Sequence, residues 1–290
     1  MSGNKRPQID LSVAREICNP LSAERFVFQY GMTAIAFFLT FLALLPLFSL
    51  VWEILRRGFS NLKLEMFVQP VIDLGFANAI VGTITMVGIG ALFSIPVGVM
   101  TGIFLSEFGG NSAVARIVRF VTTILTGVPS IVVGVFAYGV FVATTKQFSG
   151  IAGGFALGVI MLPIIALTTE EVLKLVPNSL RLASAALGGN RFQTTFRVVV
   201  AAGLPGITTA TLLAIARASG ETAPLIFTAS FSNFWSWPNT QTASLPLLIY
   251  RFYEDDRPEI FQLVWTTSIV LVGLVFLLSL LSRLITRKKI

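Results

Sequence analysis

The chain has 290 residues, of which 54% are hydrophobic and 12% are charged, and its net charge is +7. A soluble domain carries about 25% charged residues, so this composition indicates a multi-pass membrane protein. The sequence has no histidine and one cysteine, Cys18, which excludes an intramolecular disulfide, histidine-ligated metals and catalytic Ser–His or Cys–His pairs.

Long uncharged runs predict an all-α membrane protein, because each run is near or beyond the roughly 20 residues that cross a bilayer. We expect an N-terminal tail over 1–27, then a first membrane helix and a transmembrane domain over 74–284. The six predicted spans are 28–54, 76–105, 115–143, 149–169, 200–230 and 260–284. Seven spans remain an alternative, in which Thr242–Tyr250 dips back into the membrane.

The lysines and arginines between the spans predict how the chain is oriented, since cytoplasmic loops carry an excess of these residues. Most of them fall in the N-terminal tail, in the connector with Arg116 and Arg119, in the loop 170–197 and at the C-terminal end. Both termini are therefore predicted to be cytoplasmic. This asymmetry accounts for the positive net charge, so we expect no nucleic-acid partner.

The third predicted span contains an irregular spot at Gly127, Pro129 and Ser130. Irregular backbone in a membrane is tolerated only where protein or water covers it. A second irregular spot occurs in the fifth span at comparable depth. We therefore expect the two breaks to face each other across a path.

The loop 170–197 predicts a short amphipathic helix at the cytoplasmic surface. Pro177-Asn178-Ser179 is a start signal, and Gly188-Gly189-Asn190 marks a break. One apolar face follows from residues at i, i+3 and i+7, namely Leu180, Ala183 and Leu187. The run Ala183–Ala186 makes this helix slim, which suits a protein groove; a membrane-surface helix without a partner is the alternative.

The fifth span contains the stretch ARASGETAPLIF, which places Arg217 and Glu221 in an otherwise apolar run. One charge there costs roughly 3 kcal/mol on insertion scales. Residues four apart share a helix face, so the pair can offset part of this cost. Pro224 has no backbone N–H and is expected to bend the helix, and Gly220 allows close approach.

The segment Phe231–Tyr250 follows, and its polarity and two prolines predict an external loop. Its Phe and Trp side chains are typical of an aromatic anchor at the membrane interface. A docking surface for an external partner is the alternative interpretation.

Several of these segments resemble one known family. Leu180–Ile207 resembles the EAA segment of type I ABC-importer permeases; aligned on Gly188, it has Leu182 where the family has glutamate. Ala183 and Ser184 stand for the two alanines of that motif. The strongest likeness is to the phosphate permeases of this family, and it lies in GVPSIVVGVFA (127–137), in ARASGETAPLIFTA (216–229) and, less specifically, in 74–87.

The resemblance implies a non-catalytic permease subunit of an ATP-driven phosphate importer in the bacterial plasma (inner) membrane. The sequence has no GxxxxGK[ST] phosphate-binding loop, so a partner chain would hydrolyse ATP. The implied partners are a homologous second permease, an ATPase dimer, an extracytoplasmic phosphate-binding protein and membrane lipid, with no cofactor or metal. Coupling to the ATPase is assigned to the segment 177–197, with Ala183, Ser184, Gly188, Gly189 and Arg191.

With phosphate as the implied substrate, the charged pair acquires an expected role. Arg217 would bind phosphate oxygens bidentately. Glu221 would orient the guanidinium or accept a hydrogen bond from a phosphate that still carries protons. The residues expected along the path are Arg217, Ser219, Glu221, Thr222 and Ser130, with breaks at Gly127, Pro129, Gly220 and Pro224. A structural ion pair is the simpler alternative, although such pairs add little stability.

Three other functions stay open at this point. A permease for sulfate, molybdate or phosphonate would share most of these features. A passive anion channel would not need the amphipathic segment Leu180–Phe192. An intramembrane enzyme is disfavoured by the missing histidine and by the lack of an acidic pair within the membrane.

Overall fold

The computed structural model describes residues 23–287, with side chains from Glu24 to Leu284. These residues form helices joined by turns and loops, and no strand occurs among them, which confirms the all-α class. The chain divides into two units, residues 1–53 and 54–290. Most of the predicted tail with Cys18, and the last cations Lys288 and Lys289, lie outside the described residues.

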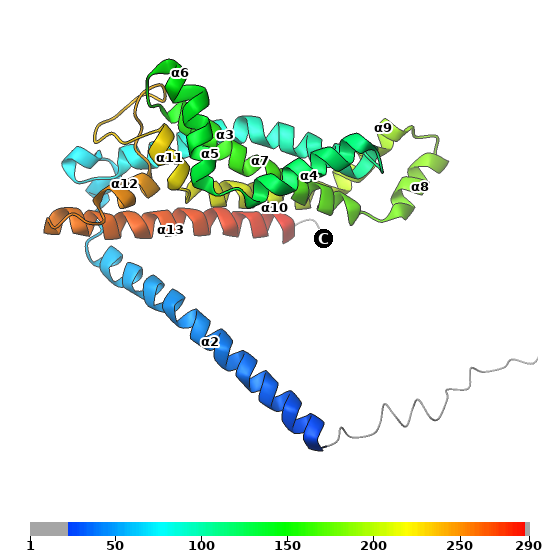
Figure 1. Cartoon of the computed structure of the whole chain (residues 1–290), viewed down its shortest axis with the longest axis horizontal. Coiled ribbons are helices and arrows are strands. Elements are labelled where there is room, and N and C mark those ends of the chain that lie inside the picture. Colours follow the sequence, from blue (N-terminus) through cyan, green and yellow to red (C-terminus); the bar gives the residue numbers. More distant parts are fainter. Residues whose placement is uncertain (1–22, 288–290) are drawn as a thin grey trace, which may run out of the picture. The chain divides into compact units, whose positions relative to one another are not determined.

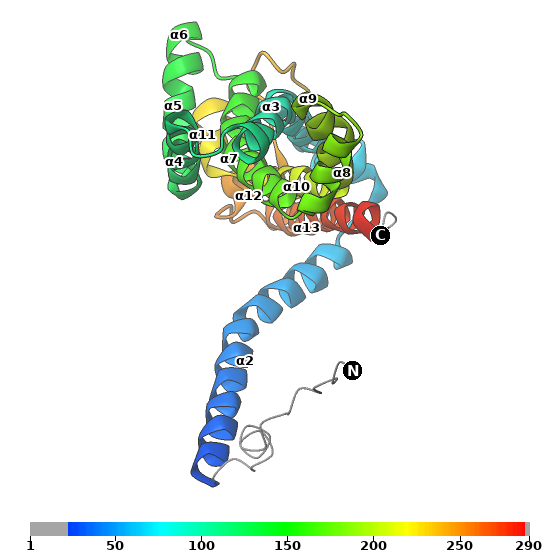
Figure 2. The same ribbon diagram turned by 90° about the vertical axis from the view of Figure 1, so that its right-hand side faces the viewer.

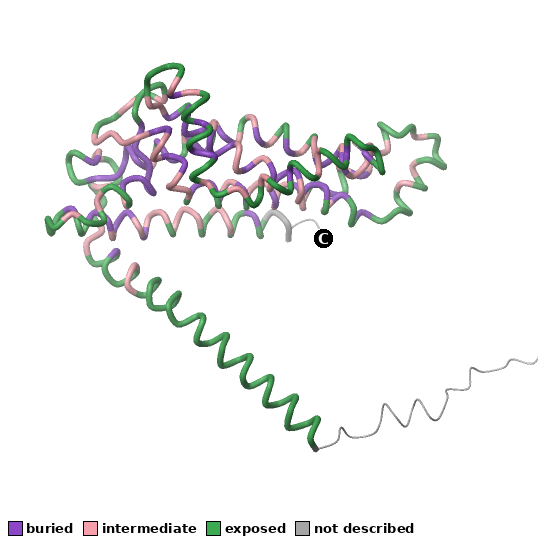
Figure 3. Tube along the Cα trace, in the orientation of Figure 1, coloured by how far each residue is buried: buried purple, intermediate pink, exposed green. Residues whose placement is uncertain are grey.

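The first unit carries most of helix α2 (Ala23–Ser60), which begins before and ends after the predicted span 28–54. Its residues from Glu24 to Trp52 are exposed, and Figure 3 colours almost the whole helix accordingly. Apolar side chains point outward all around this stretch. A helix of this kind belongs in lipid or against another apolar surface.

The second unit is a bundle of long helices with short helices at its ends and along one side (Figures 1 and 2). Its long helices are α3 (Ala77–Ile103), α4 (Ala113–Gly127), α7 (Gly150–Lys174), α10 (Val200–Ser219) and α13 (Pro258–Arg287). The short ones are α5 (Ser130–Ala137), α6 (Ala143–Thr145), α8 (Asn178–Ala186), α9 (Arg191–Gln193), α11 (Ala223–Thr228) and α12 (Leu245–Phe252). Three π-helical turns interrupt the bundle, at Phe104–Phe108, Tyr138–Val142 and Thr194–Val199, and two 3₁₀ turns lie at Leu64–Phe67 and Val71–Asp73.

Helices α3 and α7 form the centre of the bundle and approach closely through glycines. A Cβ atom added to Gly90 would lie 2.8 Å from the carbonyl oxygen of Gly154 and 2.9 Å from the nitrogen of Gly158. Small residues allow such backbone contact between membrane helices. The buried side chains beside this contact come from α3, α7, α10 and α11: Met86, Leu157, Met161, Ile165, Ala214, Ala218 and Leu225.

Five helical segments of the described chain are long and apolar enough to cross a membrane. The helices Ala113–Gly127 and Ser130–Thr145 make a sixth span if they are counted as one, and they are bent by 105° at their junction. The described residues therefore contain the predicted six spans when this bent pair is counted as one of them. A full seventh crossing by Thr242–Tyr250 is not possible, because α12 has 8 residues and is too short to cross.

The predicted spans 149–169 and 200–230 have the wrong ends. Helix α7 continues to Lys174, because Glu170 forms an ion pair with Lys174 one turn later and does not need to leave the helix for solvent. Helix α10 stops at Ser219. The backbone from Gly220 to Thr222 is not helical, and α11 begins at Ala223.

The predicted loop Phe231–Tyr250 is irregular in its first half, but its second half is buried and partly helical. Thr242–Leu248 are buried, and the backbone N–H of Leu245 donates to the Thr83 hydroxyl at 3.0 Å. Leu245 and Leu248 pack with Phe76 and Leu263 in a second core cluster. The two leucines gain more from this burial than the polar residues around them lose, so the segment folds back onto α3 and α13.

Candidate functional site

The third and fifth spans are both broken. Helix α4 ends at Gly127, Val128 and Pro129 are extended, and α5 begins at Ser130. The residue before a proline is disfavoured in helical conformation, which explains this break. In the fifth span Pro224 lies in the first turn of α11, where its missing N–H costs nothing. The expectation that Pro224 bends a helix is therefore wrong, because it begins one.

The two breaks lie against each other. A Cβ atom on Gly134 of α5 would lie 2.6 Å from the Cα of Pro224 in α11, so the two short helices touch through their backbones. A cavity of about 250 Å³ opens beside this contact. Its lining comes from both broken spans and from α7: Leu125, Thr126, Val128, Pro129, Ser130, Val133, Ile160, Ile164, Arg217 and Glu221.

Arg217 and Glu221 form the charged wall of this cavity. The Nε of Arg217 lies 3.6 Å from Oε1 of Glu221, which is an ion pair but too long for a hydrogen bond. The Arg217 side chain is 63% exposed and that of Glu221 is 18% exposed. Among the described residues, no acceptor takes a hydrogen bond from the guanidinium, so its N–H donors remain available.

The structure brings together only part of the predicted set. Pro129, Ser130, Arg217 and Glu221 share the cavity, whereas Thr222 and Ser219 are not among its lining residues. The Ser219 hydroxyl is buried and donates to the carbonyl oxygen of Ile215 at 2.8 Å. Gly127, Gly220 and Pro224 shape the breaks without lining the cavity.

The amphipathic segment 177–197 contains α8 followed by a tight turn. Gly188 has a positive φ of 80°, a conformation that favours glycine. Asn190 then caps α9, since its side chain accepts from the backbone N–H of Gln193 at 2.8 Å. A groove of about 370 Å³ runs along this segment, lined by Leu180, Ala183, Ser184, Leu187, Gly189, Gln193, Arg197 and Val198.

Arg191 is the predicted coupling residue that points elsewhere. One of its terminal nitrogens donates to the backbone oxygen of Glu107, and its guanidinium lies 5.1 Å from the ring centre of Phe108. It therefore attaches the segment to the end of α3 and does not line the groove.

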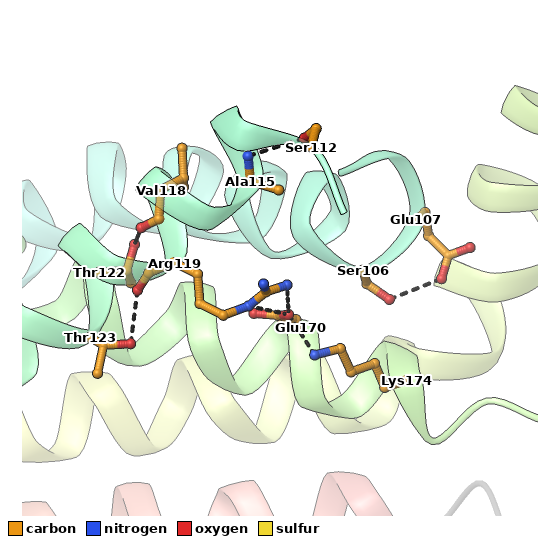
Figure 4. A network of polar contacts seen from close by, with 10 residues as sticks. All are labelled: Ser106, Glu107, Ser112, Ala115, Val118, Arg119, Thr122, Thr123, Glu170 and Lys174. Carbon is orange, nitrogen blue, oxygen red and sulfur yellow. Dashed lines mark hydrogen bonds and ion pairs between the residues drawn. The ribbon is translucent and has the colours of Figure 1, made fainter. Parts of the chain in front are cut away.

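Two paired carboxylates were missed by the sequence analysis. Glu170 accepts from Arg119 of α4 and from Lys174 of α7, each at 2.6 Å (Figure 4). Glu107, in the π-helical turn after α3, accepts from Arg181 of α8 at 2.6 Å. The only local signal was the four-residue spacing of Glu170 and Lys174; the other two partners are distant in sequence.

Comparisons with known proteins give a consistent result. The model of the family described as "Binding-protein-dependent transport system inner membrane component" matches residues 94–290. A phosphate transport system permease protein PstA of Haemophilus influenzae is 39% identical, over 85% of this chain and 90% of its own. PstA 1 of Mycobacterium tuberculosis (strain H37Rv) is 33% identical over 96% of this chain and 93% of its own. Among solved structures, a chain of the MetNI methionine ABC transporter in an inward-facing conformation has a similar fold, with a TM-score of 0.63 and 21% identity over 73% of this chain and 95% of that one.

Proposed function

The chain belongs to the family of binding-protein-dependent transport system inner membrane components, and we propose that it is the membrane-spanning permease subunit of a phosphate importer. It is a multi-pass inner-membrane protein with the fold of an ABC-transporter permease. The observation that carries the proposal is the Arg217 guanidinium at the junction of two broken spans, in a chain whose relatives are phosphate permeases.

Arg217 is proposed to contact phosphate during transit. Its guanidinium presents a planar set of donors that matches phosphate oxygens and stays charged at any physiological pH. In this chain its donors are held by no hydrogen bond to a described residue, and only the 3.6 Å ion pair with Glu221 orients it. Glu221 also keeps the site from binding the anion too strongly, which a conduit needs for release.

The partners and the orientation belong to the same proposal. A homologous second permease faces Arg217 and completes the path, and both termini of this chain are cytoplasmic. A partner ATPase dimer receives the segment 177–197, and an extracytoplasmic phosphate-binding protein docks on the opposite face. Support comes from the lysine and arginine asymmetry and from the exposed groove along α8.

A permease for another oxyanion is the nearest competing function. Arg217 alone does not distinguish phosphate from sulfate, since guanidinium binds both. Relatives between 33% and 39% identical carry the name of phosphate permeases, which favours phosphate. A passive channel has no use for α8 and its groove.

The test is phosphate uptake into vesicles that contain this chain, the second permease, the ATPase and the binding protein. Arg217→Lys keeps the charge but loses the bidentate donors, so we expect uptake to fall about tenfold or more with assembly intact. Glu221→Gln is expected to alter the rate with assembly intact. Normal uptake by Arg217→Lys would return the pair to a structural role.

A further inference from the structure

Glu107 lies at the end of the long central helix α3, inside the π-helical turn Phe104–Phe108. Its side chain is 9% exposed. Arg181 of α8 donates to both of its carboxylate oxygens, through Nη2 at 2.6 Å and Nε at 3.2 Å. A bidentate pair of this kind fixes orientation as well as distance.

Arg181 also reaches the end of α7. Its Nη1 donates to the backbone oxygen of Val176 at 2.7 Å, and its Nη2 donates to that of Leu173 at 3.0 Å. These carbonyls belong to the last turn of α7 and the residues that follow it, where helical partners are missing. One guanidinium therefore joins three elements, α8, α7 and the turn after α3. The hydrogen bonds to Glu107 raise the pKa of Arg181 further above its ordinary value, so it stays charged.

The other arm of the segment reaches the same place. Arg191 follows the Gly188 turn, donates to the backbone oxygen of Glu107 and stacks on Phe108. The two arginines come from opposite sides of the turn at Gly188-Gly189. Both arms of the segment are thus tied to one dipeptide of the bundle, Glu107-Phe108.

Close packing beyond this point links α3 to the wall of the cavity. Helices α3 and α7 are in backbone contact at Gly90, Gly154 and Gly158, so a displacement of one helix is passed on to the other by direct packing. Ile160 and Ile164 of α7 line the cavity with Arg217. A movement imposed at the Glu107 end therefore reaches one wall of the cavity through two packed helices.

From this geometry we infer that Glu107 is a positioning residue for energy coupling: it locks the segment 177–197 to α3 and α7, so that a displacement of α8 moves the wall of the Arg217 cavity. The inference rests on the proposed role of this segment as the contact with the ATPase. A purely structural ion pair would change stability or assembly alone. A coupling role predicts in addition that ATP hydrolysis and transport separate when the pair is weakened.

The experiment measures phosphate transported per ATP hydrolysed by the complete importer in vesicles, with assembly checked by co-purification. For Glu107→Gln we expect this ratio to fall about tenfold, since the variant loses the charge on one partner of a charge-assisted contact. Arg181→Lys should lower the ratio by a similar factor, because a lysine cannot reach Glu107 and two carbonyls together. Glu107→Asp keeps the carboxylate and should recover a large part of the ratio.

Glu170→Gln is the matched control. Glu170 is also a carboxylate held by charge-assisted contacts, but its cationic partners lie on α4 and α7 and none on α8. For Glu170→Gln the ratio of phosphate transported to ATP hydrolysed should stay at the wild-type value, even if the variant is less stable. If Glu107→Gln does not assemble, Arg181→Lys decides the question.

A second variant separates the inference from its premise. Gly188→Val disturbs the segment without touching Glu107. If Gly188→Val lowers the ratio while assembled Glu107→Gln and Arg181→Lys keep it, the locking role is overturned and the coupling segment stands. If none of the three variants lowers the ratio of phosphate transported to ATP hydrolysed, the segment 177–197 has no coupling role, and the inference about Glu107 loses its premise.

Discussion

The Glu170 carboxylate holds two cations through a single oxygen. Arg119 approaches Oε1 with Nη2 at 2.6 Å and Nε at 3.0 Å, and Lys174 approaches the same atom at 2.6 Å (Figure 4). The Glu170 side chain is 3% exposed, whereas both cations keep contact with the surroundings. Hydrogen bonds to a buried charge are stronger than neutral ones, so this carboxylate stabilises the contact between α4 and α7.

Glu170→Gln should therefore destabilise the protein. The amide can accept from Arg119 but leaves two uncompensated cations side by side, and we expect a loss of about 1.5–3 kcal/mol in the free energy of unfolding. Thermal unfolding of the purified chain in detergent measures this. The neighbour Glu171 is exposed, so Glu171→Gln should leave the midpoint unchanged. Equal midpoints for the two variants would show that the cluster adds nothing to stability.

These clusters mark where sequence reasoning stops at the level of single residues. Arg217 and Glu221 stand out because they are charges in an apolar run, and their four-residue spacing makes them neighbours. Arg119 and Glu170 are 51 residues apart, and Glu107 and Arg181 are 74 apart. No local pattern joins them, since their contact depends on how the helices pack.

At the scale of elements, proline and glycine indicated the breaks but not their exact form. The break at Pro129 follows from the conformation that proline imposes on Val128. At Pro224 the same residue begins a helix, because its ring suits a first turn, and the chain opens at Gly220–Thr222 instead. The end of α7 was misplaced since a paired Glu170 behaves as a helix residue and not as a loop charge.

The turn after α8 gives a prediction at this scale. Gly188 has a φ of 80° and open space where a Cβ would lie, so a larger side chain meets backbone strain and no clash. Valine there costs about 1–2 kcal/mol, which should distort the turn after α8 and lower the stimulation of ATPase activity by loaded binding protein.

Gly188→Asn is the control for this effect, because asparagine tolerates the left-handed conformation. ATPase assays on the assembled importer, with and without loaded binding protein, compare the two variants. We expect Gly188→Asn to keep most of the stimulation that Gly188→Val loses. Equal stimulation by both would mean that the geometry of this turn is irrelevant to coupling.

At the scale of the whole molecule, the chain is expected to form only one side of the proposed phosphate path. Arg217 is 63% exposed in a segment long and apolar enough to lie in a membrane. Charges within membrane spans almost always face the interior of a bundle or a water-filled cavity. Sequence reasoning could predict this need for a second wall from the charge alone. It could not identify Ile160 and Ile164 as the wall already present, since apolar residues of α7 give no signal of what they face.

Orientation is the property of the whole molecule that can be tested most directly. Asn111 follows Glu107, which is bound by Arg181 of α8, and Asn239 lies in the loop before α12; both asparagines are exposed. The proposed topology places Asn111 in the cytoplasm and Asn239 outside. In a Cys18→Ser background, Asn239→Cys should react with a membrane-impermeant maleimide in intact spheroplasts, and Asn111→Cys should react only after permeabilisation. The reverse pattern would place the α8 groove on the outer face, away from any cytoplasmic ATPase. The proposed coupling through the segment 177–197 would then be overturned.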